Sequence, residues 1–473
     1  MLYFNLLLVL LVPLSAGVLF LSLFPLKKEL YFWEKLALGF LTGLILLVMI
    51  MFFLGLARVP VGKTSVLVSW LLLSAVALWF LFRKGSFLFD VQEARGALRL
   101  DLRGWSAVES LLLALLALKT IYLFFVTLVK PVIDVDAISM YSIGAKGIFY
   151  SKSFLTPFVF ERLSSKPLFP FLSQAWVLIG LGDFNDCLIK VLTPVMFLCL
   201  LVIFYAALRR YYSRLAALVF TFLLSTLPFM VFHAATAYSD FPQMVYYALG
   251  AVYLFLFMKE QDQPRSSGSA FSFLAVSAIL LGASVWVKRG GLALVGLNLV
   301  VLLVYSLMRH LLNKDKWRAF LPAAIAFLVI SLPSIVYGQA GFLFRGMAGI
   351  VGGAATETAS SAGEVNRLQV VMETVLKKLF LYADWQLLFL LFLLVLIFCF
   401  RRAYKGPLLY LLAVILLDLG AIVAQFSFGA SFAYLLDGTL LDRLVMSVVP
   451  VVLFYCAEAI LPYFEAEDKT SKA

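Results

Sequence analysis

The stretch SAVESLLLALLALKTIYLFFVTLVKPVIDVD, residues 106–136, decides the fold class of this chain. It contains an apolar run of the roughly 20 residues that a helix needs to cross a bilayer. A proline and two aspartates, Asp134 and Asp136, follow soon after the run. The pattern predicts a membrane-spanning helix that carries two carboxylates just beyond one end.

Outward from this stretch, apolar runs dominate the whole chain of 473 residues, of which 64% are hydrophobic and 14% are charged. Ordinary soluble proteins have about 25% charged residues, and a soluble fold could not cover so much apolar surface. The composition therefore predicts an all-α polytopic membrane protein, because helices satisfy their backbone groups inside a bilayer. About thirteen spans are predicted, beginning near residues 3, 36, 64, 106, 187, 215, 241, 269, 290, 319, 384, 407 and 442.

The net charge of +12 comes from 38 Lys and Arg against 26 Asp and Glu. In a soluble protein such an excess would suggest nucleic acid as a partner. In a membrane protein, cytoplasmic loops accumulate Lys and Arg, and this explanation is favoured here over a role in binding anionic lipid. Placing the N-terminus outside puts most basic residues of short loops in the cytoplasm, together with the C-terminus. We therefore expect membrane lipids, and no nucleic acid, as partners.

Three parts are predicted along the chain. Residues 1–105 hold three spans of unassigned role and a cytoplasmic linker, residues 106–463 form the catalytic transmembrane core, and residues 464–473 are a cytoplasmic tail.

Two long loops, residues 130–186 and 338–383, fall on the predicted exoplasmic face. Each contains an apolar stripe at helical spacing, within 138–149 and 368–379, which is typical of a short helix on the membrane surface. The segment Gly349–Gly363 is rich in small residues. It is predicted to be mobile, either as a lid over a site or as a simple connector.

No cofactor is predicted. The four cysteines lack the spacing of a zinc site or a disulfide framework, and the chain has only two histidines. No nucleotide-binding loop is found, which disfavours ATP-driven transport. A divalent cation is an option only where Asp134 and Asp136 would bind it together.

Asp134 and Asp136 are the first candidate site. Two carboxylates at the membrane boundary can take a proton from a hydroxyl group or hold a metal ion. The structural alternative is that Asp136 caps the helix that follows while Asp134 is solvated. Capping and catalysis do not exclude each other.

Basic residues on the same face form the second group. Lys288 and Arg289 lie at the exoplasmic end of a span, against the positive-inside trend, and Arg443 is the sole cation of its predicted loop. Arg and Lys both bind phosphate, so these residues predict a lipid-phosphate site. The alternatives are a snorkelling Lys288–Arg289 pair and a local ion pair between Arg443 and Asp442.

Two further motifs supply Lys166, in SSKPLFP (164–170), and Tyr238 with Asp240, in AYSDFP (237–242). The alternatives are a rigid turn for the first motif and, for the second, a helix start with Asp240 at the positive end of the helix dipole. Within the spans, Lys119 and Asp418 are predicted to neutralise each other, because charges inside a membrane usually pair.

Taken in order, these motifs resemble those of membrane glycosyltransferases of the GT-C fold, notably the protein O-mannosyltransferases and the lipid A aminoarabinose transferases. The resemblance covers roughly residues 106–460 and rests on the aspartates, on DAISMYSIGAK (136–146), on KPLFP (166–170) and on YSDFP (238–242). The chain differs from the family in the Val between its two acids, and in Leu-Phe-Pro where relatives often have Pro-Leu.

The resemblance implies a sugar donor on a polyprenyl phosphate and inverting transfer to a hydroxyl of a lipid, glycan or protein acceptor. It implies transfer on the exoplasmic face, with a prokaryotic cytoplasmic membrane as the expected location. Asp136 matches the family's base best and Asp134 is second. Substrate and phosphate binding would involve Lys166, Tyr238, Asp240, Lys288, Arg289 and Arg443. The alternatives are an O-antigen polymerase or ligase with a diphosphate-linked donor, and a lipid or sugar flippase.

Overall fold

The computed structural model describes residues 2–470, except for 25, 27–28, 86, 88–103, 164–165, 263–268, 430 and all but a few positions of 313–366. Every regular element among the described residues is a helix, and eight stretches are long and apolar enough to cross a membrane. These are α1 (Leu2–Leu21), α2 (Phe32–Leu56), α3 (Lys63–Lys84), α5 (Ala107–Val129), the run Leu188–Arg209 with α9 (Leu192–Arg209), α12 (Asp240–Asp262), α13 (Ser269–Val287) and α19 (Pro407–Phe428). The all-α membrane fold is confirmed, whereas the count of thirteen spans is not.

Several predicted spans are interrupted or shortened. The one expected near residue 215 breaks into α10 (Arg214–Ser225) and α11 (Pro228–Ala234), which are bent by 72° at the proline. The last span begins only after a separate short helix. The remaining helices of this part of the fold are α14 (Gly290–Leu312), α17 (Leu388–Phe398), α18 (Phe400–Ala403), α20 (Phe432–Leu436), α21 (Leu441–Val445) and α22 (Val449–Thr470).

Other predictions fall where nothing is described or where the structure differs. The span expected near residue 319, the segment Gly349–Gly363 and most of the linker before residue 105 lie outside the described residues. The tail expected from residue 464 is a continuation of α22, which is helical to Thr470.

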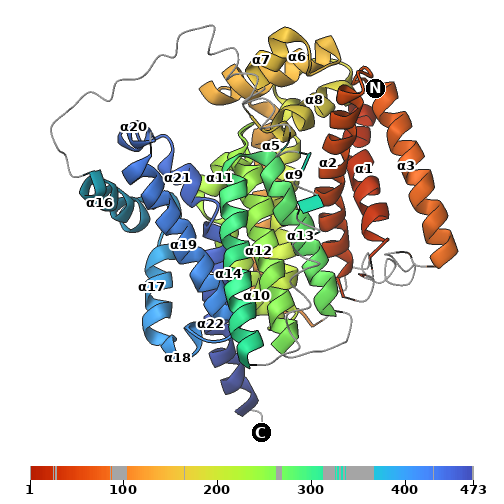
Figure 1. Cartoon of the computed structure of the whole chain (residues 1–473). Helices are drawn as coiled ribbons and strands as arrows, with labels where there is room; N and C mark the ends of the chain where they lie inside the picture. The colour runs from red at the N-terminus through yellow and green to blue at the C-terminus, as the bar shows by residue number, and fades with distance from the viewer. Residues whose placement is uncertain are drawn as a thin grey trace.

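The loop expected after α5 folds into four helical segments at one end of the bundle, which we call the site end (top of Figure 1). These segments are a π-helical turn (Ala137–Ser142), α6 (Ile143–Ser151), α7 (Pro157–Leu163) and α8 (Phe169–Leu181). Every residue of α8 is buried, so this loop contributes to the core and is more than a surface segment. The second amphipathic helix, α16 (Arg367–Phe380), forms as predicted and buries Val371, Val375 and Leu379.

Helix α12 is the central element of the bundle, and its whole apolar window is buried. It contacts α9, α13, α19 and α22, as its place in the middle of Figure 1 illustrates. Its first residue, Asp240, is therefore carried by a helix with little freedom to move.

The first two helices are packed into the core and are not a detached unit. Gly17 of α1 faces Gly39 and Gly43 of α2 so closely that an added Cβ on Gly43 would lie 1.6 Å from the Pro13 carbonyl oxygen. Both helices also contact α8, and α2 contacts α9. A buried ion pair of 2.6 Å joins Glu34 to Arg210, close to the turn after α9.

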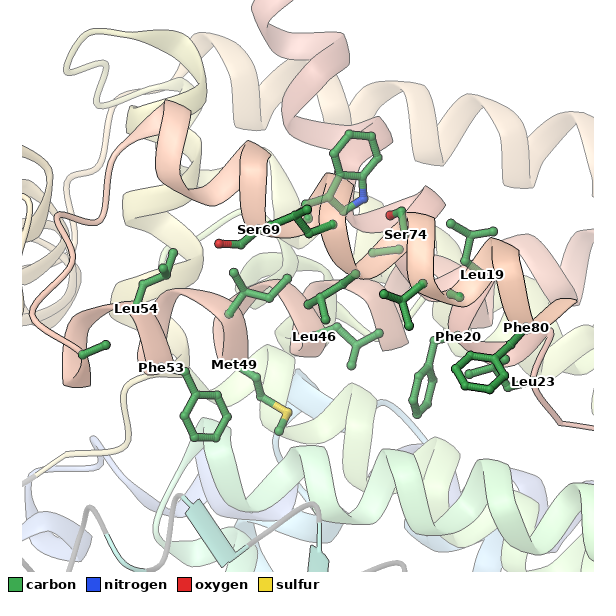
Figure 2. A pocket seen from close by; sticks show the side chains of 18 residues that line it. Leu19, Phe20, Leu23, Leu46, Met49, Phe53, Leu54, Ser69, Ser74 and Phe80 are labelled. Atoms are coloured by element: carbon green, nitrogen blue, oxygen red, sulfur yellow. The ribbon is translucent and has the colours of Figure 1, made fainter.

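Helix α3 stands further out and forms, with α1 and α2, an apolar groove of about 740 Å³. Figure 2 shows its walls, in which Phe20, Leu46, Phe53 and Phe80 are typical and Ser69 is one of few polar residues. The groove has no group suited to acid–base chemistry, so the candidate active site lies elsewhere.

Candidate active site

Four charged residues from four segments meet at the site end of the bundle. Arg443, on α21, donates from Nη1 to Asp136 at 2.9 Å, from Nη2 to Asp240 at 2.8 Å and from Nε to Asp240 at 3.0 Å. Lys288 forms an ion pair with the other carboxylate oxygen of Asp240. We call these four residues the charge cluster.

The two carboxylates of the charge cluster differ in their environment. The side chain of Asp240 is fully buried, whereas 46% of the Asp136 side chain is exposed. Two cations balance two carboxylates, so the cluster carries no net charge. The buried Asp240 is its fixed centre, and Asp136 is the member that can reach a ligand.

Local structure explains how each cation is positioned. The turn between α13 and α14 is tight, because a Cβ on Gly291 would lie 2.4 Å from the Ser284 carbonyl oxygen. The Gly291 amide donates to the Lys288 carbonyl at 2.9 Å, which closes the turn. Only glycine fits there, and the turn directs Lys288 to the positive end of α12, where the helix dipole also favours Asp240.

Arg443 is held on both sides. Burial alone would lower the pKa of Arg443, but the Asp240 carboxylate outweighs it and raises the pKa above its usual value. The guanidinium lies 4.8 Å from the centre of the Tyr238 ring, an arrangement typical of a cation–π contact. Arg443 therefore stays cationic and fixed in orientation.

The π-helical turn connects Asp136 to the start of α12. The hydroxyls of Tyr141 and Ser239 are hydrogen-bonded at 2.7 Å, next to Asp240 in sequence. Burial, with the Asp240 charge adding to it, raises the pKa of Tyr141 to about 12, so this hydroxyl stays protonated. Single-turn π-helices occur often at functional sites, because they re-aim the side chains that follow.

Asp134 points to a different place from Asp136. It lines a cavity of about 490 Å³ together with Lys119, Lys130 and Lys190. Burial raises the pKa of Tyr238, and the negative charge of Asp134 raises it further. Asp134 is therefore near the aromatic ring that contacts Arg443. Asp136 thus belongs to the charge cluster, whereas Asp134 belongs to the neighbouring cavity.

The remaining predicted residues lie around these spaces. Lys166 is half-buried in the turn before α8, and Arg289 is exposed in the turn before α14. The contacts of the charge cluster given above involve neither of them.

Two pairings expected from the sequence are replaced by others. Asp442 does not pair with its neighbour Arg443; it accepts from Lys378 of α16 at 2.7 Å. Asp418 accepts from the hydroxyl of Tyr247, whereas Lys119 lies 5.6 Å from the centre of the Phe222 ring. The predicted Lys119–Asp418 pair was wrong, because Lys119 of α5 faces α10 and Asp418 of α19 faces α12.

The two aspartates do not fit a shared divalent cation. Asp136 is occupied by Arg443, Asp134 lies close to Lys190, and no group of three His, Cys, Asp or Glu that could hold a metal occurs among the described residues. A cation-rich setting opposes a further cation.

Sequence reasoning missed three contributors to the site. Tyr141 lies in DAISMYSIGAK and Ser239 in YSDFP, but the sequence alone gives neither residue a role. His233 is buried with its ring centre 5.3 Å from that of Tyr238. Its position seven residues before Asp240 was the available signal, but a lone histidine in an apolar run is usually structural.

Chemically, the site offers a half-exposed carboxylate for proton removal and two cations that can stabilise a departing anion. The cations are already neutralised by carboxylates. An incoming phosphate would therefore have to displace the exposed carboxylate, Asp136, since Asp240 is buried beneath both cations.

No protein-family model and no curated protein matches this chain. Among solved structures it is similar to ArnT from Cupriavidus metallidurans in the apo state, with a TM-score of 0.52 and 18% sequence identity, over 76% of this chain and 62% of that chain. It is also similar to the same protein bound to undecaprenyl phosphate, with a TM-score of 0.51 and 18% identity, over 73% of this chain and 59% of that chain. The chain thus spans about three fifths of the length of ArnT. It is an integral membrane protein with the GT-C fold.

Proposed function

We propose that the protein is a membrane glycosyltransferase that moves a sugar from a polyprenyl-phosphate donor to a hydroxyl acceptor. The observation that carries this proposal is the charge cluster, in which Arg443 links the exposed Asp136 to the buried Asp240. The fold shared with ArnT, one structure of which is bound to undecaprenyl phosphate, supports a lipid-linked donor.

In the proposed reaction, the donor phosphate takes the Nη1 position on Arg443 that Asp136 holds in the free protein. Released from Arg443, Asp136 accepts the proton of the acceptor hydroxyl as the oxygen attacks the anomeric carbon. The bond between that carbon and the phosphate oxygen breaks, and the departing phosphate keeps the electron pair. Arg443 and Lys288 stabilise its charge, and attack from the opposite face inverts the anomeric centre.

The site would lie on the exoplasmic face, with the N-terminus outside and the C-terminus in the cytoplasm. This sidedness rests on the distribution of Lys and Arg in short loops. The two termini lie at opposite ends of the bundle in Figure 1, which agrees with it. The acceptor could be a lipid, a glycan or a protein, and the proposal requires no metal.

The test is a transfer assay in proteoliposomes with a panel of polyprenyl-phosphate sugars. Asp136→Asn should lower kcat by at least about a hundredfold, the usual effect of losing a general base. Asp437→Asn is the matched control, because Asp437 is an exposed carboxylate at the same end of the bundle. Full transfer by Asp136→Asn with a normally folded protein would contradict the assignment of the base.

A diphosphate-linked donor, as in an O-antigen polymerase or ligase, is the second candidate. The same assay distinguishes the two, because a diphosphate donor would then be used in preference to each monophosphate donor. A flippase would move a fluorescent lipid between leaflets without forming a new glycosidic bond.

A further inference from the structure

The cavity that Asp134 lines is a groove between α5 and the broken helix pair α10–α11. We call it the lysine groove. Its charged residues are Lys119, Lys130, Asp134 and Lys190, and its apolar walls include Tyr122, Leu123, Val126, Phe197, Val231 and Phe232. Tyr122 and Phe232 are 63% and 50% exposed, so the groove opens sideways, in the direction where lipid surrounds the bundle.

The lining of the lysine groove has three ammonium groups and one carboxylate, and the exposed Asp186 outside the lining also acts on Lys190. Within the described part of the chain, none of the four charged lining residues forms an ion pair. This differs from the charge cluster, in which Asp240 and Asp136 already neutralise both cations. The ammonium groups of the groove lining are therefore available to an added anion without displacing a paired carboxylate.

Lys190 is the best-defined of the three cations. Its side chain is buried, and its Nζ donates to the Lys130 carbonyl at 2.7 Å. An ammonium group has three donors, so two are left for a ligand beside the exposed Lys130. Lys119 lies eleven residues earlier on α5, about 16 Å along the helix axis. A lysine at that depth is costly in a bilayer and usually marks a functional site.

We infer that the lysine groove binds the anionic head group of a second membrane lipid. The phosphate would lie against Lys190 and Lys130, a hydroxyl of the head group would donate to Asp134, and the hydrocarbon chain would lie along the apolar walls. The side opening and the apolar walls favour a lipid over a free anion. The inference goes beyond the proposed function, because the groove binds such a lipid whether or not sugar transfer follows.

The test measures lipid binding to the full-length protein in detergent by native mass spectrometry. The probes are dioleoyl phosphatidylglycerol, which has a phosphate and hydroxyls, and dioleoylglycerol, which has the same chains without the phosphate. Lys190→Gln and Lys130→Gln should each weaken phosphatidylglycerol binding by about tenfold, the loss expected for one charge-assisted hydrogen bond. Dioleoylglycerol binding should not change.

Lys130→Gln keeps the experiment decisive, because Lys130 is exposed and the loss of its ammonium group should leave the fold intact. Lys152→Gln is the matched control, since Lys152 is an exposed lysine at the same end of the bundle. Unchanged phosphatidylglycerol binding in both groove variants would overturn the inference. So would displacement of the lipid by excess inorganic phosphate, which would indicate a site for free anions.

The two proposals fail in different ways. Asp136→Asn should bind phosphatidylglycerol like the wild type, because Asp136 is not part of the lysine groove. Loss of lipid binding in the lysine variants would support the inference even where no sugar is transferred. Normal binding in those variants, with transfer abolished in Asp136→Asn, would overturn the inference and leave the proposed function standing.

Discussion

At the scale of single residues, Asp240 determines how the other charges of the site are arranged. It is fully buried, it begins the central helix and it accepts from both Arg443 and Lys288. Asp136 has one of these partners and is half-exposed. The same residue type therefore has two roles here, one as an anchor and one as the group that can exchange its partner.

We predict that Asp240→Asn destabilises the protein, whereas Asp136→Asn does not. Removing the buried carboxylate leaves two cations against the single carboxylate of Asp136, and an uncompensated buried charge typically costs about 3 kcal/mol or more. The measurement is the melting temperature of each variant in detergent, followed with a fluorescent dye that does not react with thiols. Equal melting temperatures for Asp240→Asn and the wild type would show that Asp240 is not the anchor.

A second prediction concerns divalent cations. Because Asp136 faces Arg443 and Asp134 lies close to Lys190, sugar transfer should persist in excess EDTA. The measurement is the initial rate with EDTA, with EDTA plus Mg²⁺ and with EDTA plus Mn²⁺. A rate that collapses with EDTA and returns with one metal would require a different arrangement of the two aspartates.

At the scale of elements, the turn between α13 and α14 and the π-helical turn bring the site residues together. The first turn carries Lys288 and the second follows Asp136, and both reach the start of α12. A short break in helical geometry thus positions Lys288 on one side of the start of α12 and Asp136 on the other. The bend between α10 and α11 has a related effect, since Thr226 and Pro228 at the bend line the lysine groove.

We predict that Gly291→Val lowers kcat/KM by about a hundredfold, the usual effect of moving a catalytic group by about 1 Å. The added side chain would collide with the Ser284 carbonyl oxygen and open the turn that holds Lys288. Gly290→Ala is the control, because a Cβ there meets nothing within 4 Å. Equal activity of both variants would mean that the turn does not position Lys288.

At the scale of the whole molecule, distant parts of the chain are joined by buried charges. Glu34 of α2 pairs with Arg210 and also accepts from Tyr253 of α12. At the other end of the chain, Glu458 of α22 pairs with Lys259 of α12 at 2.6 Å. The N-terminal helices and the last helix are both locked to the central helix in this way.

We predict that Glu34→Gln lowers the stability of the whole protein by about 3 kcal/mol, because it removes the buried carboxylate that Arg210 contacts at 2.6 Å. The melting temperature of the purified protein is the readout. Glu373→Gln, which removes an exposed pair with Lys377, should have little effect. A melting temperature that is the same in both variants would mean that α2 is held by packing alone.

The sequence was sufficient for the fold class and for the members of the charge cluster, but not for their pairings. The apolar run after Ser106 and the two aspartates beyond it specify a span and a boundary site by local pattern alone. Whether Arg443 pairs with Asp442 or with Asp240 depends on how α21 is rotated, and the sequence of one short helix does not determine that. Helix α8 was missed because its apolar run is too short to span a membrane, although burial in protein requires no such length.

The ion pair between Glu34 and Arg210 has a consequence for biosynthesis. The two residues are 176 positions apart. At a synthesis rate of about 5–20 residues per second, the ribosome needs roughly 10 to 35 s to make the partner of a carboxylate that is already at the membrane. During that interval Glu34 lacks the partner that it has in the folded protein. The contact that ties α2 to the end of α9 can form only after Arg210 has been made, so the N-terminal helices reach their final packing late in synthesis.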